Sequence, residues 1–163
     1  MKRLLILRHA KSSWADSSID DWQRPLNDRG ERDAPRAGEW LRARDLLPDL
    51  IISSDAIRAR ATAEAAAEAA GLSKAIVLEP SLYHAAPEDV IEVLNAVNDE
   101  MRSVLIVGHN PGLEELVGTL AGEAHGMPTA GLFVFDVPIT RWRDLDLASD
   151  ASLIEMWQPR RGD

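Results

Sequence analysis

Two histidines in this sequence follow short apolar runs, and they are the residues best suited to chemistry. Arg8 and His9 come directly after Leu4–Leu7, and His109 follows Val104–Val107 with one glycine between them. A guanidinium group binds phosphate through paired hydrogen bonds and keeps its charge at physiological pH. A neutral imidazole can attack phosphorus and form a covalent phosphoryl intermediate. These residue types together indicate a site that binds and transfers a phosphoryl group.

A third segment supplies a second guanidinium group. The apolar run Leu50–Ile52 is followed by Ser53 and Ser54, which can cap a helix or take part in the site, and Arg58 comes one helical turn later. None of these segments carries an acidic cluster of the kind that binds magnesium. Cationic side chains would therefore have to supply the electrostatic stabilisation that a metal ion provides in other phosphoryl-transfer sites.

The elements that must position these residues alternate along the chain. Strands are expected at Leu4–Leu7, Leu50–Ile52, Ala75–Leu78, Val104–Val107, Leu132–Val137 and Leu153–Trp157. Helices are expected at Ala34–Arg44, with Pro35 in the first turn, and at Ile57–Ala70, Pro87–Asn98 and Gly112–Ala121. The first four apolar runs are nearly continuous, which is typical of parallel strands covered on both faces.

This alternation predicts an α/β protein, specifically a three-layer α/β/α sandwich with a mostly parallel central sheet. In such sheets, sites lie beyond the carboxyl ends of the strands. Arg8, His9, Arg58 and His109 all follow predicted strands, although they come from three separate segments. We therefore expect them to meet at one edge of the sheet.

Composition places further bounds on the function. The 163 residues suit one domain spanning 1–163, and the absence of cysteine excludes disulfides and thiolate metal sites. A net charge of −9 disfavours nucleic acid as a partner. The sequence has no apolar stretch long enough for a membrane span, and its apolar start is too short for a signal peptide. A cytoplasmic monomer is the expectation.

Several segments together resemble one known family. Leu5-Ile6-Leu7-Arg8-His9-Ala10 is similar to the Arg-His-Gly opening of the histidine phosphatase superfamily, which includes the phosphoglycerate mutases. Arg24-Pro25-Leu26 with Arg29-Gly30, Ser53-Ser54 with Arg58-Ala59, Gly108-His109-Asn110 and Pro128-Thr129-Ala130-Gly131 resemble its later segments in the same order. The short length and the variant Arg-His-Ala-Lys-Ser resemble the SixA-type phosphohistidine phosphatases most.

The resemblance implies a phosphoglycerate mutase-like fold and a role for each candidate residue. His9 would be the nucleophile that becomes phosphorylated, Arg8 and Arg58 would hold the phosphoryl oxygens, and His109 would stabilise the transferring group. Ser12 and Asn110 would make lesser contacts with the substrate. It also implies that the chain uses no metal and no organic cofactor.

The chain departs from the wider family in ways that bear on its substrate. Many members carry a carboxylic acid after the third strand that protonates an alcohol leaving group, and no residue in the segment 79–89 matches it clearly; Glu79, Glu88 and Asp89 are the candidates. The chain also lacks the length for the inserted cap of larger relatives. An alkoxide leaving group, with a conjugate acid pKa near that of water at ~16, needs a proton, whereas imidazole, near ~6.5, leaves unaided. Phosphohistidine on a phosphotransfer domain or phosphocarrier is therefore the favoured substrate.

Two other functions stay open at this stage. The chain could be a phosphatase for small phosphate esters, or a phospho-recognition module with little turnover, although the presence of His9 argues against a pure binder. Asp20, Asp21 and Asp28 form an acidic stretch with no matching metal shell. Trp14 and Trp22 flank this stretch and are expected to pack, or to offer a partner surface if the loop is exposed near the site.

Overall fold

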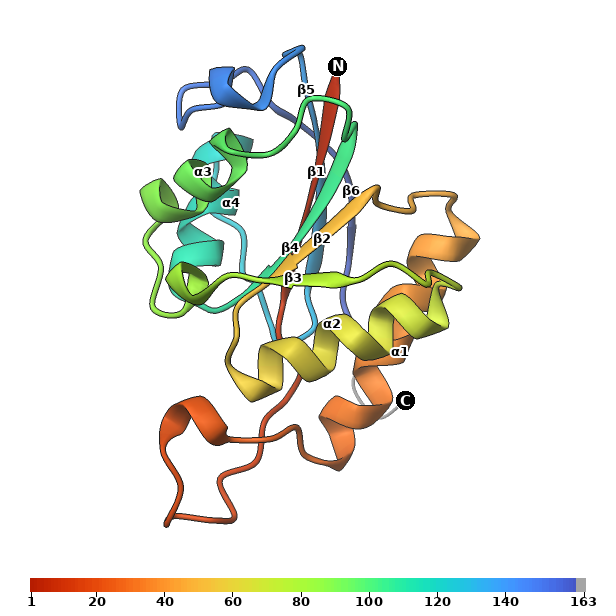
Figure 1. Cartoon of the computed structure of the whole chain (residues 1–163), viewed down its shortest axis with the longest axis vertical. Helices are drawn as coiled ribbons and strands as arrows, with labels where there is room; N and C mark the ends of the chain where they lie inside the picture. Colours follow the sequence, from red (N-terminus) through yellow and green to blue (C-terminus); the bar gives the residue numbers. More distant parts are fainter. Residues whose placement is uncertain (161–163) are drawn as a thin grey trace.

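The computed structural model describes residues 1–160 and shows a central sheet of six strands, so residues 161–163 of the predicted domain lie outside the described range. The strands are β1 (Lys2–Arg8), β2 (Leu50–Ser53), β3 (Ile76–Leu78), β4 (Ser103–Gly108), β5 (Leu132–Val137) and β6 (Ser152–Trp157). Their order is β3-β2-β4-β1-β5-β6; β1 to β4 are parallel, and β5 pairs antiparallel with β1 and β6 (Figure 1). The predicted mostly parallel sheet is confirmed.

Four α-helices cover the two faces of this sheet (Figure 1). The helices are α1 (Asp28–Ala43), α2 (Ile57–Ala69), α3 (Pro87–Asn95) and α4 (Gly112–Ala121). Because successive residues of a strand point to opposite faces, Leu5 and Leu7 pack in one apolar cluster with α1 and α2, while Leu4 and Ile6 pack in the other with α3 and α4. All four leucine and isoleucine side chains are fully buried. The strand is apolar throughout because both of its faces are covered, which confirms the predicted three layers.

The first helix begins earlier than the sequence analysis expected. It starts at Asp28, not at Ala34, because the Asn27 side chain accepts a hydrogen bond from the Gly30 amide at 2.9 Å and caps the helix. The acidic residues Asp28 and Glu31 of the first turn also favour this N-terminus. The placement of Pro35 in the first turn was therefore wrong, since Pro35 lies inside the helix.

Helix α3 and strand β3 also differ from expectation. Helix α3 ends at Asn95, three residues before the predicted end. Strand β3 is short and lies at the edge of the sheet, where Val77 and Leu78 are 46% and 38% exposed. The prediction that the third apolar run is covered on both faces was wrong, because apolar content alone does not distinguish an edge strand from a central one.

The parallel register brings the carboxyl ends of β1, β2 and β4 to one edge. Arg8 lies opposite Gly108 and Ser53 lies opposite Val107. The alignment continues past the strands, since the His9 amide donates to the Gly108 carbonyl at 3.0 Å. Within residues 1–160 no helix is long and apolar enough to cross a membrane.

Candidate active site

His9 lies at the carboxyl end of β1 with its ring fixed by the backbone. The residue is 7% exposed, and Nδ1 lies 2.7 Å from the carbonyl oxygen of Ala10. A carbonyl can only accept a hydrogen bond, so Nδ1 carries the proton and Nε2 carries the lone pair. This is the tautomer that a nucleophilic imidazole needs.

The surroundings of His9 also keep the ring neutral. The pKa of His9 is lowered to about 4, chiefly by burial and also by the positive charges of Arg58, Arg8 and Arg24, against the opposing effect of the hydrogen bond to Ala10. Burial disfavours a charged imidazole, and neighbouring cations disfavour it again. At neutral pH the Nε2 lone pair is therefore available to attack.

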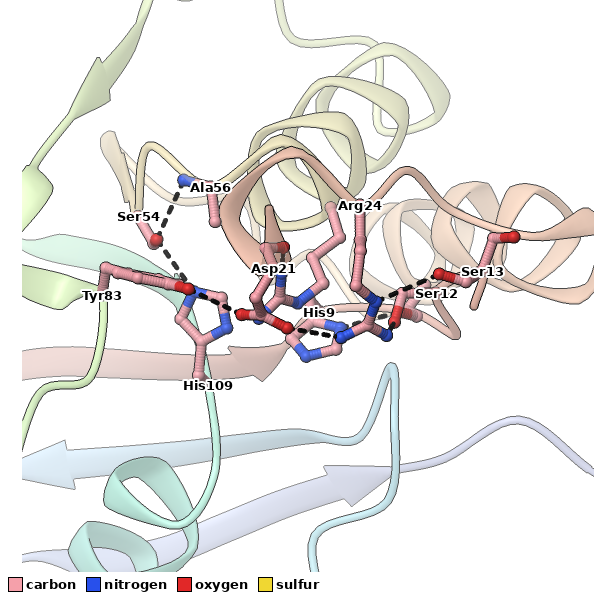
Figure 2. A network of polar contacts seen from close by, with 11 residues as sticks. His9, Ser12, Ser13, Asp21, Arg24, Ser54, Ala56, Tyr83 and His109 are labelled. Carbon is pink, nitrogen blue, oxygen red and sulfur yellow. Dashed lines mark hydrogen bonds and ion pairs between the residues drawn. The ribbon is translucent and has the colours of Figure 1, made fainter. Parts of the chain in front are cut away.

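His109 follows β4 and lies beside His9, with the two ring centroids 5.1 Å apart. Its Nε2 lies 2.8 Å from the hydroxyl oxygen of Ser54, which also accepts the Ala56 amide at 3.2 Å (Figure 2). Ser54 therefore both accepts from the backbone just before α2 and orients the ring. Burial lowers the pKa of His109 to about 3, with smaller contributions from neighbouring charges that include Arg58.

Arg58, in the first turn of α2, is held by Asp21. Its Nη2 donates to the Asp21 carboxylate at 2.9 Å and its Nη1 donates to the Asp21 carbonyl at 2.7 Å. The same carboxylate accepts the Tyr83 hydroxyl at 2.6 Å (Figure 2). This hydrogen bond, with those from Arg24 and Arg58, holds the pKa of Asp21 well below its usual range, so the carboxylate stays ionised. Arg58 keeps its guanidinium plane fixed next to the two histidines.

Arg24 is a buried guanidinium that the sequence analysis had not selected. It donates to the Asp21 carboxylate at 2.7 Å, to the Ser13 carbonyl at 3.0 Å and to the hydroxyl of Ser12 (Figure 2). Its charge lowers the pKa of His9, which places it in the same electrostatic environment. The predicted contact residue Ser12 is buried and is engaged by Arg24.

Arg8 and Asn110 meet on the other side of the site. Both donate to the carbonyl oxygen of Met127, at 3.0 Å from Arg8 Nη1 and 2.9 Å from Asn110 Nδ2. They line a cleft of about 660 Å³ together with Arg29 and Glu114. The predicted residues thus lie at one sheet edge, with Arg8 and Asn110 oriented toward this cleft.

The turn after His9 is fixed by tight packing. The Ala10 amide donates to the Thr62 hydroxyl at 2.9 Å, and that hydroxyl donates to the Arg58 carbonyl at 2.7 Å. A Cβ atom on Gly30 would lie 2.1 Å from the Lys11 carbonyl oxygen, so only glycine allows α1 to approach the turn this closely. These contacts fix the position of His9 relative to Arg58.

Several buried polar atoms at this edge have capacity for a ligand. Arg8 Nε, Arg58 Nε, His109 Nδ1 and the acceptor atom Asn110 Oδ1 have no hydrogen-bond partner among residues 1–160. Buried polar groups of folded proteins are nearly always paired, so unpaired ones point to a ligand or a solvent molecule. Because guanidinium nitrogens only donate, the group that fits here is rich in acceptor oxygens, as a phosphoryl group is.

Three residues of this network were not recognised from sequence. Asp21 was assigned only to an acidic stretch, Arg24 was noted only within a resembling segment, and Tyr83 was not considered. Among residues 1–160, no three or more histidine, cysteine, aspartate or glutamate side chains lie together so that they could hold a metal ion. Arg24 lies three residues after Asp21, a spacing that permits the ion pair, and this was the available signal.

The two histidines should make the fold sensitive to acid. Their pKa values of about 4 and about 3 in the folded protein lie below the ordinary value of about 6.5, so between these limits the unfolded chain binds more protons. The folding stability linked to the two neutral histidines is complete above about pH 6.5. It falls as the pH drops from there, at up to about 1.4 kcal/mol per pH unit per histidine, until the folded pKa values are passed. Urea unfolding at pH 7, 6 and 5 measures this slope.

A His9→Gln, His109→Gln double variant should show a shallower pH slope than the native chain. A His125→Gln variant serves as the control, because His125 lies outside the network. Equal slopes in the native chain and the double variant would contradict the proposed burial of two neutral imidazoles.

Comparison with known proteins finds a matching family and a similar protein of nearly the same length. The model of the histidine phosphatase superfamily (branch 1) matches residues 4–84. An uncharacterized protein of Mycobacterium tuberculosis, Rv1276c, is 37% identical over 165 residues, which cover 94% of this chain and 100% of the relative.

Solved structures of similar proteins match this chain over nearly its whole length. The Agrobacterium tumefaciens protein assigned as the phosphohistidine phosphatase SixA is 33% identical, with a TM-score of 0.83 over 97% of this chain and 98% of that one. A Nakamurella multipartitia protein with the same assignment is 28% identical, with a TM-score of 0.78 over 97% and 96%. The chain therefore belongs to the histidine phosphatase superfamily and has the phosphoglycerate mutase-like α/β fold of its SixA relatives.

Proposed function

We propose that the chain, as one domain over residues 1–163, is a phosphatase that removes phosphate from histidine on a partner protein through a phosphorylated His9. The observation that carries the proposal is the state of His9. Its Nδ1 is bound to the Ala10 carbonyl and burial keeps its ring neutral, so Nε2 has a free lone pair among guanidinium groups.

The reaction would proceed in two displacements. In the first, His9 Nε2 forms a bond to phosphorus while the bond from phosphorus to the partner's imidazole nitrogen breaks. The partner's ring, already protonated on its other nitrogen, leaves as neutral imidazole. In the second, a water molecule attacks the phosphorylated His9, which gives inorganic phosphate and restores the ring. No redox step or added co-reactant is needed.

The surrounding cations would stabilise the phosphoryl group during transfer. Arg8 and Arg58 would bind its oxygens, and their unpaired buried Nε atoms support this role. Arg24 would add a third positive charge. His109, oriented by Ser54, would donate from Nδ1 to an oxygen as charge shifts in the transition state. Guanidinium and imidazole groups would thus provide the stabilisation that a metal ion provides elsewhere.

The acidic residues near the site support an imidazole leaving group. Glu79 accepts the Ser81 hydroxyl at 2.9 Å, and Asp89 accepts the Ala86 amide at 2.8 Å as part of the α3 cap. Glu88 is an exposed residue of the first turn of α3. Asp21 stays ionised and cannot donate a proton. An alkoxide would lack a clear proton donor among these carboxylates, whereas an imidazole needs none.

The relatives support the same substrate class. Two solved structures that match nearly the whole chain are assigned as phosphohistidine phosphatases. A partner protein carrying phosphohistidine, such as a phosphotransfer domain or a phosphocarrier, is the substrate that we propose on these grounds.

One feature favours a second candidate, a phosphatase for small phosphate esters. His84 lines a small cleft of about 250 Å³ together with His109 and Asn110. Its ring lies 3.9 Å from that of Tyr83, between centroids. A histidine in this place could protonate an alcohol leaving group, which the carboxylates do not.

A turnover comparison in the presence of EDTA tests the proposal. We expect rapid loss of phosphate from a phosphocarrier protein phosphorylated on histidine, and turnover of a panel of sugar and nucleotide phosphates at least about a hundredfold lower in kcat/KM, because a proton donor contributes about 10²–10⁴-fold to reactions that need one. Inorganic phosphate release measures both activities.

The His84→Ala variant separates the two enzyme functions. Phosphohistidine turnover should be unchanged by this substitution, and any ester turnover should fall. Ester turnover equal to or faster than phosphohistidine turnover, and dependent on His84, would replace our proposal with the second candidate. Tight binding of the phosphorylated carrier with no release of phosphate would instead indicate a recognition module.

A further inference from the structure

The segment between β1 and α1 projects beyond the sheet edge that carries the site (Figure 1). It includes Trp14, which is 74% exposed, and Trp22, which is 39% exposed. Tryptophan is rarely left in water to this extent, because its large apolar surface gains free energy on burial. An exposed tryptophan next to an active site is typical of a surface that another protein covers.

Trp14 contacts Arg24, and Arg24 connects it to the site. The Arg24 guanidinium carbon lies 3.3 Å from the centroid of the Trp14 ring, on one face of the indole. Arg24 in turn binds Asp21 and the backbone of Ser13, the residue before Trp14. The indole is thus supported by a buried, hydrogen-bonded guanidinium, while most of its surface faces solvent. A protein that covers Trp14 would lie next to the arginine and histidine cluster.

The same segment carries exposed negative charge. Asp16 and Asp20 are exposed, and neither forms an ion pair with another described residue that would neutralise it. Among residues 1–160, Asp16 accepts hydrogen bonds only from the amide and hydroxyl of Ser18, at 2.9 and 2.5 Å. The whole chain has a net charge of −9. Such a surface attracts a basic partner and repels an acidic one.

We propose that Trp14, with the carboxylates of Asp16 and Asp20, forms a docking surface for the phosphohistidine-bearing protein, and that this partner presents an apolar patch with basic residues beside its phosphohistidine. This inference rests on the proposed function. It adds which part of the chain selects the protein substrate and what chemistry the substrate's surface has. Free phosphohistidine, which has no such surface, does not use the docking residues.

The Trp14→Ala variant tests the docking surface on two substrates. With a phosphorylated phosphocarrier that has basic residues around its phosphohistidine, KM should rise roughly ten- to thirtyfold with little change in kcat, the range expected for loss of an interface hot spot. With free phosphohistidine, kcat/KM should stay within about twofold of the native value. Trp14→Phe keeps an aromatic ring on Arg24 and should recover part of the lost affinity.

Leu47→Ala is the matched control. Leu47 is also an exposed apolar residue, 37% exposed, but it precedes β2 and therefore lies at the opposite edge of the parallel sheet. Its replacement should leave KM for the phosphorylated carrier unchanged.

The carboxylates are tested by their salt dependence. The Asp16→Asn, Asp20→Asn double variant keeps the size of each side chain and one acceptor oxygen, but it removes two negative charges. Its KM for the basic carrier should rise severalfold at low ionic strength, and the difference should shrink at about 0.5 M salt, where charges are screened within a few ångströms. Asp150→Asn, which removes an exposed carboxylate before β6, should have no such effect.

The outcomes separate the docking surface from the proposed function. Equal losses of Trp14→Ala on carrier and free phosphohistidine would show that the indole only holds Arg24, which overturns the docking inference. A carrier KM that Trp14→Ala leaves unchanged overturns it as well, while the function stands. If the native chain turned over free phosphohistidine or esters but not the phosphorylated carrier, the proposed protein substrate would fail, and docking with it.

Discussion

Turnover of protein phosphohistidine should fall by at least about 10⁴-fold when His9 is replaced by alanine, the loss typical of removing a nucleophile. The substitution removes the one atom of this chain that bonds to phosphorus in the proposed reaction, the Nε2 of a ring held by the Ala10 carbonyl. Arg8, Arg58 and His109 would still bind the phosphoryl group. The loss should therefore appear in kcat, with the affinity for the phosphorylated carrier largely retained. Single-turnover release of phosphate measures the effect.

His125→Ala is the control for this variant. His125 lies near Phe133, with ring centroids 5.7 Å apart, and has no contact with His9 in the described structure. Its replacement should leave kcat within about twofold of the native value. A His9→Ala variant that retained a tenth of the activity would show that water attacks the substrate directly, and that His9 only positions it.

The second large effect concerns Arg58. Replacing it with alanine should lower kcat/KM by about 10²–10³-fold, because it removes a fixed donor to the phosphoryl oxygens in the transition state. Arg58→Lys should recover only a small part, since an ammonium group keeps the charge but cannot both bind Asp21 through two nitrogens and leave a third donor for substrate. Steady-state kinetics on the phosphorylated carrier would measure both variants.

Arg60 offers a close control for Arg58, because it lies two residues further along the same helix and points to solvent. Its side chain is 56% exposed and pairs with Glu64 at 2.8 Å. Arg60→Ala should change kcat/KM by less than about twofold. Comparable losses in the Arg58 and Arg60 variants would mean that general charge on α2, and not the Arg58 guanidinium at the site, supports activity.

The sheet was predictable from the sequence because its central strands are buried on both faces. Leu4–Leu7 and Val104–Val107 are apolar at every position, and the structure places them side by side in parallel register. The same property made β3 misleading, since an edge strand can be equally apolar. The start of α1 was missed because the capping amino acid, Asn27, gains its role only when its side chain meets the Gly30 amide.

Some residues of the site could likewise be predicted from the sequence, and others could not. Arg8 ends β1, and His9 and His109 directly follow β1 and β4, so the strand register alone brings them to one edge. Asp21 and Arg24 lie in an irregular segment whose path depends on contacts with side chains distant in sequence. The Asp21 carboxylate meets Tyr83, 62 residues away, and Arg58, 37 residues away. Local patterns carry no information about such pairs.

Two buried hydroxyl groups, which do not react themselves, hold the reactive residues in place. Thr62 connects the Ala10 amide to α2, and Ser54 orients the ring of His109. Both side chains are fully buried, and the sequence alone left open whether Ser54 caps a helix or takes part in the site. Their role follows from the three-dimensional arrangement, in which they fix the two histidines relative to Arg58.

The central claim, that phosphate passes through His9, is tested most directly by identifying the phosphorylated residue during turnover. The chain is mixed with excess phosphorylated carrier in EDTA, quenched within milliseconds at alkaline pH, where the nitrogen–phosphorus bond of phosphohistidine survives, and digested for mass spectrometry. We predict phosphate on the peptide that contains His9, forming and decaying at least as fast as steady-state turnover. Phosphate on another residue, such as His109, or phosphate release with no phosphorylated enzyme at any time, would contradict the account.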